Sequence, residues 1–138
     1  MEPYGFLIEK TAKKLKQHFQ REFTRLESGI TVDQWGILDA LNHRDGISQN
    51  EIAEITYKDA PTVTRIIDLL IQKDLIRRQP DGIDRRRHNV YLSEQGRAKI
   101  AELMPAVNAL REKGWQKLGD KEYQQLVGIL HTVYTNFD

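Results

Sequence analysis

The sequence predicts a mainly α-helical fold with one small β-hairpin. Three observations favour it. Apolar residues recur at three- and four-residue steps through most of the chain. Residues 77–97 break that period with two short strand patterns around a turn. With 138 residues, the chain can build one core but is too short for two, so we expect a single domain over residues 1–138.

The composition fits a soluble globular protein, with 39% hydrophobic and 30% charged residues. The chain has no cysteine, which excludes disulfides and thiolate zinc sites. The first residues lack a basic segment followed by an apolar one, and no apolar run approaches the ~18 residues that span a bilayer. We therefore expect a cytoplasmic protein.

Two helices are expected before residue 46. The first covers about residues 5–26, and its apolar residues at helical spacing are Ile8, Ala12, Leu15, Phe19, Phe23 and Leu26. The second starts at a capping box, in which Thr31 caps the helix and Gln34 reaches back from the N3 position. Trp35, Leu38 and Leu41 are its inward residues.

The capping pattern repeats at the next helix. Ser48 is the expected cap and Glu51 its partner, and this third helix is short, ending by about Thr56. Asp59 or Ala60 caps a fourth helix, whose first turn accepts Pro61 because the missing N–H would have no partner there. The apolar stripe of this fourth helix consists of Val63, Ile66, Ile67 and Leu70.

A hairpin follows the fourth helix. Its strands start near Ile76 and cover residues 89–92, and Asp81-Gly82 favours a turn because glycine adopts positive φ without a Cβ clash. Ser93 caps a fifth helix that runs to about Leu118, broken or bent near Pro105 unless its local hydrogen bonds rearrange. A last helix carries an apolar seam formed by Tyr123, Leu126, Leu130, Val133 and Phe137.

Positive charge is concentrated in the middle of the chain. Residues 58–99 carry 10 Lys and Arg residues against 6 Asp and Glu residues. The flanking segments have a small excess of acidic residues, 7 against 9 in residues 1–57 and 4 against 5 in residues 100–138. The middle segment can therefore attract a polyanion, although a solvated charged loop is the alternative interpretation.

The short third helix, the turn and the longer fourth helix form a helix-turn-helix pattern, and the hairpin adds a wing. Such a unit places its second helix in the major groove of DNA, while arginines on the wing reach the backbone or a narrow minor groove. Arg65 can contact guanine through two hydrogen bonds. The residues expected to contact DNA are Gln49, Pro61, Thr62, Thr64, Arg65, Arg85, Arg86 and Arg87.

Each of these roles has an alternative. The two threonines can instead satisfy local backbone groups, and Arg65 can pair with Asp68. We expect one of the three wing arginines to be held by Asp84 or Asp68 as a structural residue, and Arg86 to point into the groove.

Three segments resemble the MarR (multiple antibiotic resistance regulator) family of winged-helix transcriptional regulators. Residues 30–38 are similar to the opening of the family's second helix, and residues 61–68 are similar to its recognition helix. Asp84-Arg85-Arg86, followed by residues 90–93 and by Gly96-Arg97, resembles its wing signature. The three segments occur in order and at the family's spacing, and the likeness covers nearly the whole chain.

The resemblance implies a homodimer that binds a pseudo-palindromic operator and usually represses transcription. It implies a DNA-binding lobe over residues 30–97 and dimerisation helices over residues 1–29 and 98–138. The terminal helices independently carry many large apolar residues, among them Phe19, Phe23, Trp115, Tyr134 and Phe137, although packing within one monomer is the alternative.

The resemblance also implies a small apolar or aromatic effector, for which Trp35, Tyr57, Phe19 and His18 are the candidate contacts. No cofactor is expected, and the histidines at 18, 43, 88 and 131 lack the spacing of metal ligands. The sequence has no glycine-rich phosphate loop and no nucleophile with a recognisable base, so we do not expect an enzyme. The alternative function is a winged-helix module that binds proteins without sequence-specific DNA binding.

Overall fold

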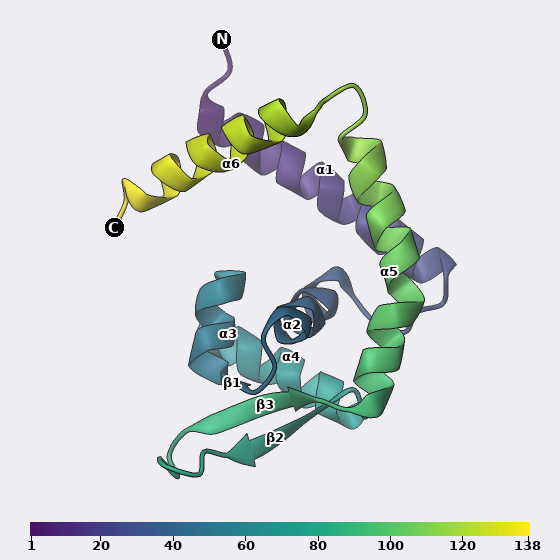
Figure 1. Ribbon diagram of the computed structural model, residues 1–138, viewed down its shortest axis with the longest axis vertical. Helices are drawn as coiled ribbons and strands as arrows, with labels where there is room; N and C mark the ends of the chain where they lie inside the picture. The colour runs from purple at the N-terminus through teal and green to yellow at the C-terminus, as the bar shows by residue number, and fades with distance from the viewer. The chain divides into compact units, whose positions relative to one another are not determined.

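The computed structural model describes all 138 residues and is mainly helical with one small sheet, which confirms the predicted fold class (Figure 1). The chain divides into two compact units, Met1–Ala106 and Val107–Asp138. The first contains α1 (Tyr4–Arg25), α2 (Val32–His43), β1 (Ile47–Ser48), α3 (Gln49–Thr56), α4 (Ala60–Gln72), β2 (Ile76–Pro80), β3 (His88–Leu92) and the first part of α5 (Glu94–Gly114). The second contains the end of α5 and all of α6 (Asp120–Thr135).

The helix starts form as the capping patterns predict. The backbone N–H of Gln34 donates to Thr31 Oγ1 at 3.1 Å, and the side chain of Gln34 accepts the N–H of Thr31 in return. At α3, Ser48 Oγ accepts the N–H of Glu51 at 3.1 Å. Asp59 is the residue that caps α4. These local bonds satisfy amides that would otherwise lack partners and so fix where each helix begins.

The core of the first unit lies among α2, α3, α4 and the inner face of β3. The apolar stripe predicted for α4 is buried, as are the inward residues of α2. Phe23 at the end of α1 is fully buried, and its ring centroid lies 5.8 Å from that of Trp35. Side chains that are less than 2% exposed in this core are Phe23, Ile37, Leu38, Leu41, Ile52, Val63, Ile67, Leu70 and Val90.

The hairpin belongs to a three-stranded antiparallel sheet in the order β1-β3-β2. Ile47 pairs with Val90, so β1 joins the start of α3 to the wing. Strand β1 was not predicted, because two residues are too few to show an alternating pattern. Gly46 before it has φ of +73°, and a Cβ there would lie 2.7 Å from the ring of Tyr91, so glycine is needed on both counts.

One prediction about the helices after the wing is wrong. The fifth helix ends at Gly114 rather than near Leu118, because the chain turns through Lys117, whose φ is +71°, and the indole of Trp115 donates to the carbonyl of Gly119 at 3.2 Å. Pro105 lies inside α5 without breaking it. No helix of the structure combines the length and apolar character needed to cross a bilayer.

Candidate nucleic-acid interface

The start of α4 is fixed at the helix-turn-helix by a side-chain cap. Asp59 Oδ1 accepts the backbone N–H of Thr62 at 2.8 Å, and this bond lowers the pKa of Asp59 below its ordinary value. Tyr57 adopts the left-handed conformation that ends α3 and turns the chain towards α4. The cap therefore sets the direction in which the outer face of α4 points.

Charged hydrogen bonds tie this unit to neighbouring helices. Asp33 on α2 accepts Lys16 of α1 at 3.0 Å and Lys58 of the α3–α4 turn at 2.9 Å. Burial raises the pKa of Asp33, but the bonds from Lys58 and Lys16 outweigh it, so the pKa is lowered. At the other end of α4, Lys73 donates to Gly29 O at 2.6 Å and to Gln34 Oε1 at 2.9 Å.

The outer face of α4 carries the residues predicted to contact DNA. Pro61, Thr64 and Arg65 are exposed on one open hollow along the helix, while Thr62 is half-buried beside the Asp59 cap. Arg65 does not pair with Asp68, because Asp68 is bound to Arg78 of β2 at 2.8 Å. The guanidinium of Arg65 has no ion pair or hydrogen bond and is attracted only by the charge of Asp59.

Gln49 joins α3, α4 and the wing. Its amide nitrogen donates to Thr64 Oγ1 at 3.2 Å, and its amide oxygen accepts Arg78 Nε at 2.6 Å. Arg78 in turn donates to Asp68 on α4. Sequence reasoning placed Gln49 at the site but missed Arg78, because the bond between them crosses 29 residues of sequence.

The tip of the wing is a turn built on carboxylates. Asp84 accepts the N–H of Arg87 with its carbonyl at 3.0 Å and the N–H of Arg86 with its side chain at 3.0 Å. Arg85 and Arg86 therefore occupy the centre of the turn, exposed and without an ion pair. Gly82 does not have the positive φ that the sequence analysis expected, because the carboxylates of Asp81 and Asp84 supply the turn-forming hydrogen bonds.

Arg87 is the wing arginine with a structural contact, but not to the predicted partners. Its guanidinium is bound to Glu51 of α3 and lies 3.7 Å from Asp81 Oδ2, instead of pairing with Asp84 or Asp68. The physical reason is that the side chain of Asp84 is used by a backbone amide of the turn and that of Asp68 by Arg78. Arg87 shares Glu51 Oε1 with the capping contact of Ser48, while Glu51 Oε2 lies 3.5 Å from Arg44.

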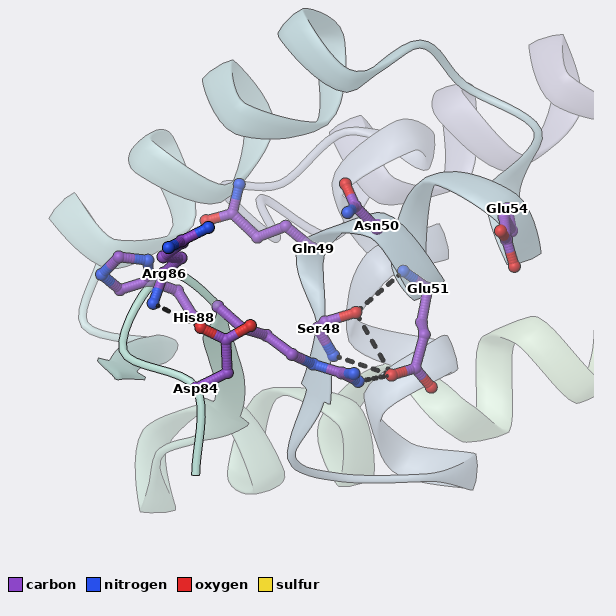
Figure 2. A pocket seen from close by; sticks show the side chains of 9 residues that line it. Ser48, Gln49, Asn50, Glu51, Glu54, Asp84, Arg86 and His88 are labelled. Carbon is purple, nitrogen blue, oxygen red and sulfur yellow. Dashed lines mark hydrogen bonds and ion pairs between the residues drawn. The ribbon is translucent and has the colours of Figure 1, made fainter. Parts of the chain in front are cut away.

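A polar pocket of about 540 Å³ lies between the start of α3 and the wing. Figure 2 shows Asp84, Arg86 and His88 on one side and Asn50, Glu51 and Glu54 on the other, with the bonds of Glu51 beside Ser48. Gln49 lines this pocket and bonds to Thr64, which lines the hollow along α4. The structure thus brings six of the predicted residues into one connected surface, whereas Thr62 and Arg85 line neither hollow.

The surface combines free guanidinium groups, hydroxyls and helix-start amides, which is the donor set that phosphates and base edges require. No group of three or more His, Asp or Glu side chains is arranged to hold a metal ion.

The comparisons with known proteins agree with this geometry. A model of the MarR family matches residues 28–87, from the end of the first helix to the wing tip. The transcriptional repressor NicR of Pseudomonas putida is 27% identical over 129 residues, covering 94% of this chain and 80% of NicR.

Among solved structures, the S. aureus MepR–DNA complex matches with a TM-score of 0.85 and 25% identity, covering 99% of both chains. Bordetella bronchiseptica BpsR, whose DNA binding is regulated by 6-hydroxynicotinic acid, matches with a TM-score of 0.84 and 26% identity, covering 96% of this chain and 99% of BpsR.

Proposed function

We propose, from the premise that the chain belongs to the MarR family of winged-helix transcriptional regulators, that it acts as a homodimeric repressor. DNA binding and regulation of transcription are properties of the family, and the chain is not an enzyme. The finer proposal is that two copies occupy a pseudo-palindromic operator and block transcription until an effector releases them. Because a regulator works where its DNA is, we also propose a cytoplasmic location.

Three exposed guanidinium groups without ion pairs give the main support for DNA binding. Arg65 lies on the second turn of α4, and Arg85 and Arg86 lie at the wing tip. Most of the other arginines in this lobe are already bound to a carboxylate or stacked on a ring. Holding three cations unpaired has no folding benefit, so a polyanion is the partner they suit.

In the proposed complex each element has a separate task. Arg65, with Thr64 beside it, reads base edges in the major groove, while Pro61 and Thr62 lie against the backbone. Arg86 enters the minor groove and Arg85 contacts its phosphate rim. Gln49 and Arg87 serve mainly to position α4 and the wing, because their side chains are already engaged within the protein.

Exposed apolar side chains support the dimer. The exposed large apolar residues of α1 are Tyr4, Phe6, Leu7, Ile8 and Leu15. Those of α6 are Tyr123, Leu126, Val127, Ile129, Leu130 and Tyr134. Phe23 is buried within the chain, so it does not belong to this interface. Apolar faces of this extent are typical of a surface covered in the assembly, and we propose residues 1–29 and 98–138 as the dimerisation segments.

We further propose a small aromatic or apolar effector, following BpsR. Such a ligand would change the separation of the two recognition helices from the ~34 Å that one turn of the duplex requires. We do not propose Trp35 as a contact, because it packs on Phe23 in the core, whereas Tyr57 and His18 are exposed and Phe19 is half-buried.

Hydroxyl-radical footprinting on DNA flanking the protein's own gene tests the proposal. We expect two protected half-sites related by a dyad, with centres about ten base pairs apart. Protection of a single half-site, or of no sequence in preference to another, would contradict the dimeric operator model and favour the protein-binding alternative.

A further inference from the structure

The wing tip presents one apolar side chain to solvent. Ile83 is 99% exposed, so it adds nothing to the core, whereas the apolar residues of β3, Val90 and Leu92, are buried. A single exposed isoleucine is common on protein surfaces and is not informative by itself. What sets Ile83 apart is its position, because it is 99% exposed at the tip of the wing, two and three residues before the exposed Arg85 and Arg86.

The backbone around Ile83 is held firmly. Asp81 N–H donates to Arg87 O at 2.7 Å, which closes the loop between β2 and β3. Ile83 N–H donates to Asp81 Oδ1 at 2.9 Å, and the carboxylate of Asp84 fixes the next turn through the amide of Arg86. These bonds, on both sides of Ile83, present its side chain outward in a defined conformation, which reduces the entropy lost on binding.

The surroundings of Ile83 are cationic. Arg85 and Arg86 follow it by two and three residues, both exposed and without ion pairs. The adjacent carboxylates of Asp81 and Asp84 accept hydrogen bonds from backbone amides of the tip, and neither forms an ion pair with Arg85 or Arg86. Two acidic and three basic residues in the segment 81–87 leave the tip with an excess of one positive charge. The tip therefore combines one apolar side chain with two free cations, which matches a surface that is anionic at its rim and apolar on its walls.

The minor groove of DNA is such a surface, because phosphates line its rim and deoxyribose sugars form its walls. We propose that Ile83 enters the minor groove beside Arg86 and packs against the sugar walls, so that the wing discriminates A·T from G·C base pairs. This inference rests on the proposed DNA-binding function. Guanine projects its N2 amino group into the groove floor, where an apolar side chain would leave the donor without a partner.

Three alternating duplexes of about two helical turns test the inference: dA·dT, dG·dC and dI·dC. Inosine lacks the N2 amino group of guanine, so dI·dC has an A·T-like minor groove but presents the acceptors of G·C in the major groove. A difference in affinity between dI·dC and dG·dC therefore comes from contacts of the wing in the minor groove and not from contacts of α4 in the major groove. Affinity is measured by fluorescence anisotropy at low salt and over a salt titration.

We expect Ile83→Ala to weaken binding to dA·dT and dI·dC by about fivefold and to change binding to dG·dC little. The substitution removes three side-chain carbons, which the proposed contact covers only in part. The salt slope should stay that of the wild type, since no charge is removed. Ile83→Val should retain most of the affinity. Ile55→Ala, which truncates a 58% exposed isoleucine on α3, is the matched control and should change none of the three affinities.

Equal losses on all three duplexes, or no loss on any, would overturn the inference while leaving the proposed function intact. Failure of the wild-type protein to bind any of them at low salt would instead overturn the proposed function. Ile83 buries no area in the protein, so misfolding of the variant is not a competing explanation.

Discussion

Replacing Arg86 with alanine tests the electrostatic role of the wing most sharply. Arg86 is exposed at the centre of the turn, its backbone is fixed by Asp84, and its side chain makes no ion pair, so the substitution removes one charge without releasing another. The fold should be unaffected. Any change in DNA binding then reports the lost contact and not a rearranged wing.

The expected magnitude follows from counterion release. Each phosphate contact contributes about 0.9 to the slope of log affinity against log salt, so one lost contact in each protomer lowers the slope of a dimer by about two. When salt rises from about 50 to 200 mM, the ratio of wild-type affinity to variant affinity should therefore fall by roughly tenfold. Binding to the operator and to unrelated DNA should weaken together.

The assay is a salt titration of wild type and variant on one labelled duplex, with Lys13→Ala as the matched control. Lys13 on α1 has a side chain that is 71% exposed, pairs with Glu9 of its own helix at 3.0 Å and lies outside the proposed DNA-binding lobe. Its loss should leave the slope unchanged, and sedimentation of the variant checks that the dimer still forms. A slope for Arg86→Ala equal to that of the wild type would refute the assignment of Arg86 to a DNA contact.

Three further predictions follow from the site. Arg65→Ala should reduce discrimination between operator and scrambled DNA by about 1–3 kcal/mol for each lost base contact, and equal losses on both DNAs would exclude base reading by Arg65. Glu51→Gln keeps a partner for the α3 cap but removes the charge that binds Arg87, so hydrogen exchange at wing amides should accelerate while α3 amides stay protected; unchanged wing exchange would show that this ion pair does not hold the wing. Asp33→Asn should destabilise the protein near neutral pH, because it removes the charge that binds Lys58 and Lys16. These bonds lower the pKa of Asp33 in spite of its burial. The stabilisation they give is complete above the ordinary Asp pKa of about 4 and is lost as pH falls through the lowered pKa of the folded state. Urea unfolding of both proteins across pH measures it, and a difference that persists at the most acidic pH would contradict the ion-pair explanation.

Local signals in the sequence predicted much of the fold correctly. The caps at Thr31, Ser48 and Asp59 and the stripe of α4 depend on residues three or four positions apart, and all of them form. The helix-turn-helix followed from those elements because their order and spacing leave few arrangements. The same reasoning identified the wing from its strand pattern and its arginine triplet.

Features that depend on distant residues could not be predicted in this way. The bond of Arg87 to Glu51 crosses 36 residues, and nothing near Arg87 in sequence distinguishes it from Arg85 or Arg86. Arg78 likewise has no feature in the sequence that distinguishes it from other strand residues, and its bond to Gln49 forms only because the fold places the two side chains together. Pairing partners among exposed charged residues are set by tertiary geometry, so the sequence predicted that one wing arginine would be structural but named the wrong carboxylates.

We expect two copies of this chain to bind one duplex through α4 and the wing. Sedimentation velocity of the protein with a labelled duplex from its own upstream region, at low ionic strength, tests this directly. The protein should sediment as a dimer in the absence of DNA and as a complex of two chains on one duplex, weakened as salt is added. A protein that stays monomeric, or that leaves the duplex sedimenting alone, would contradict it.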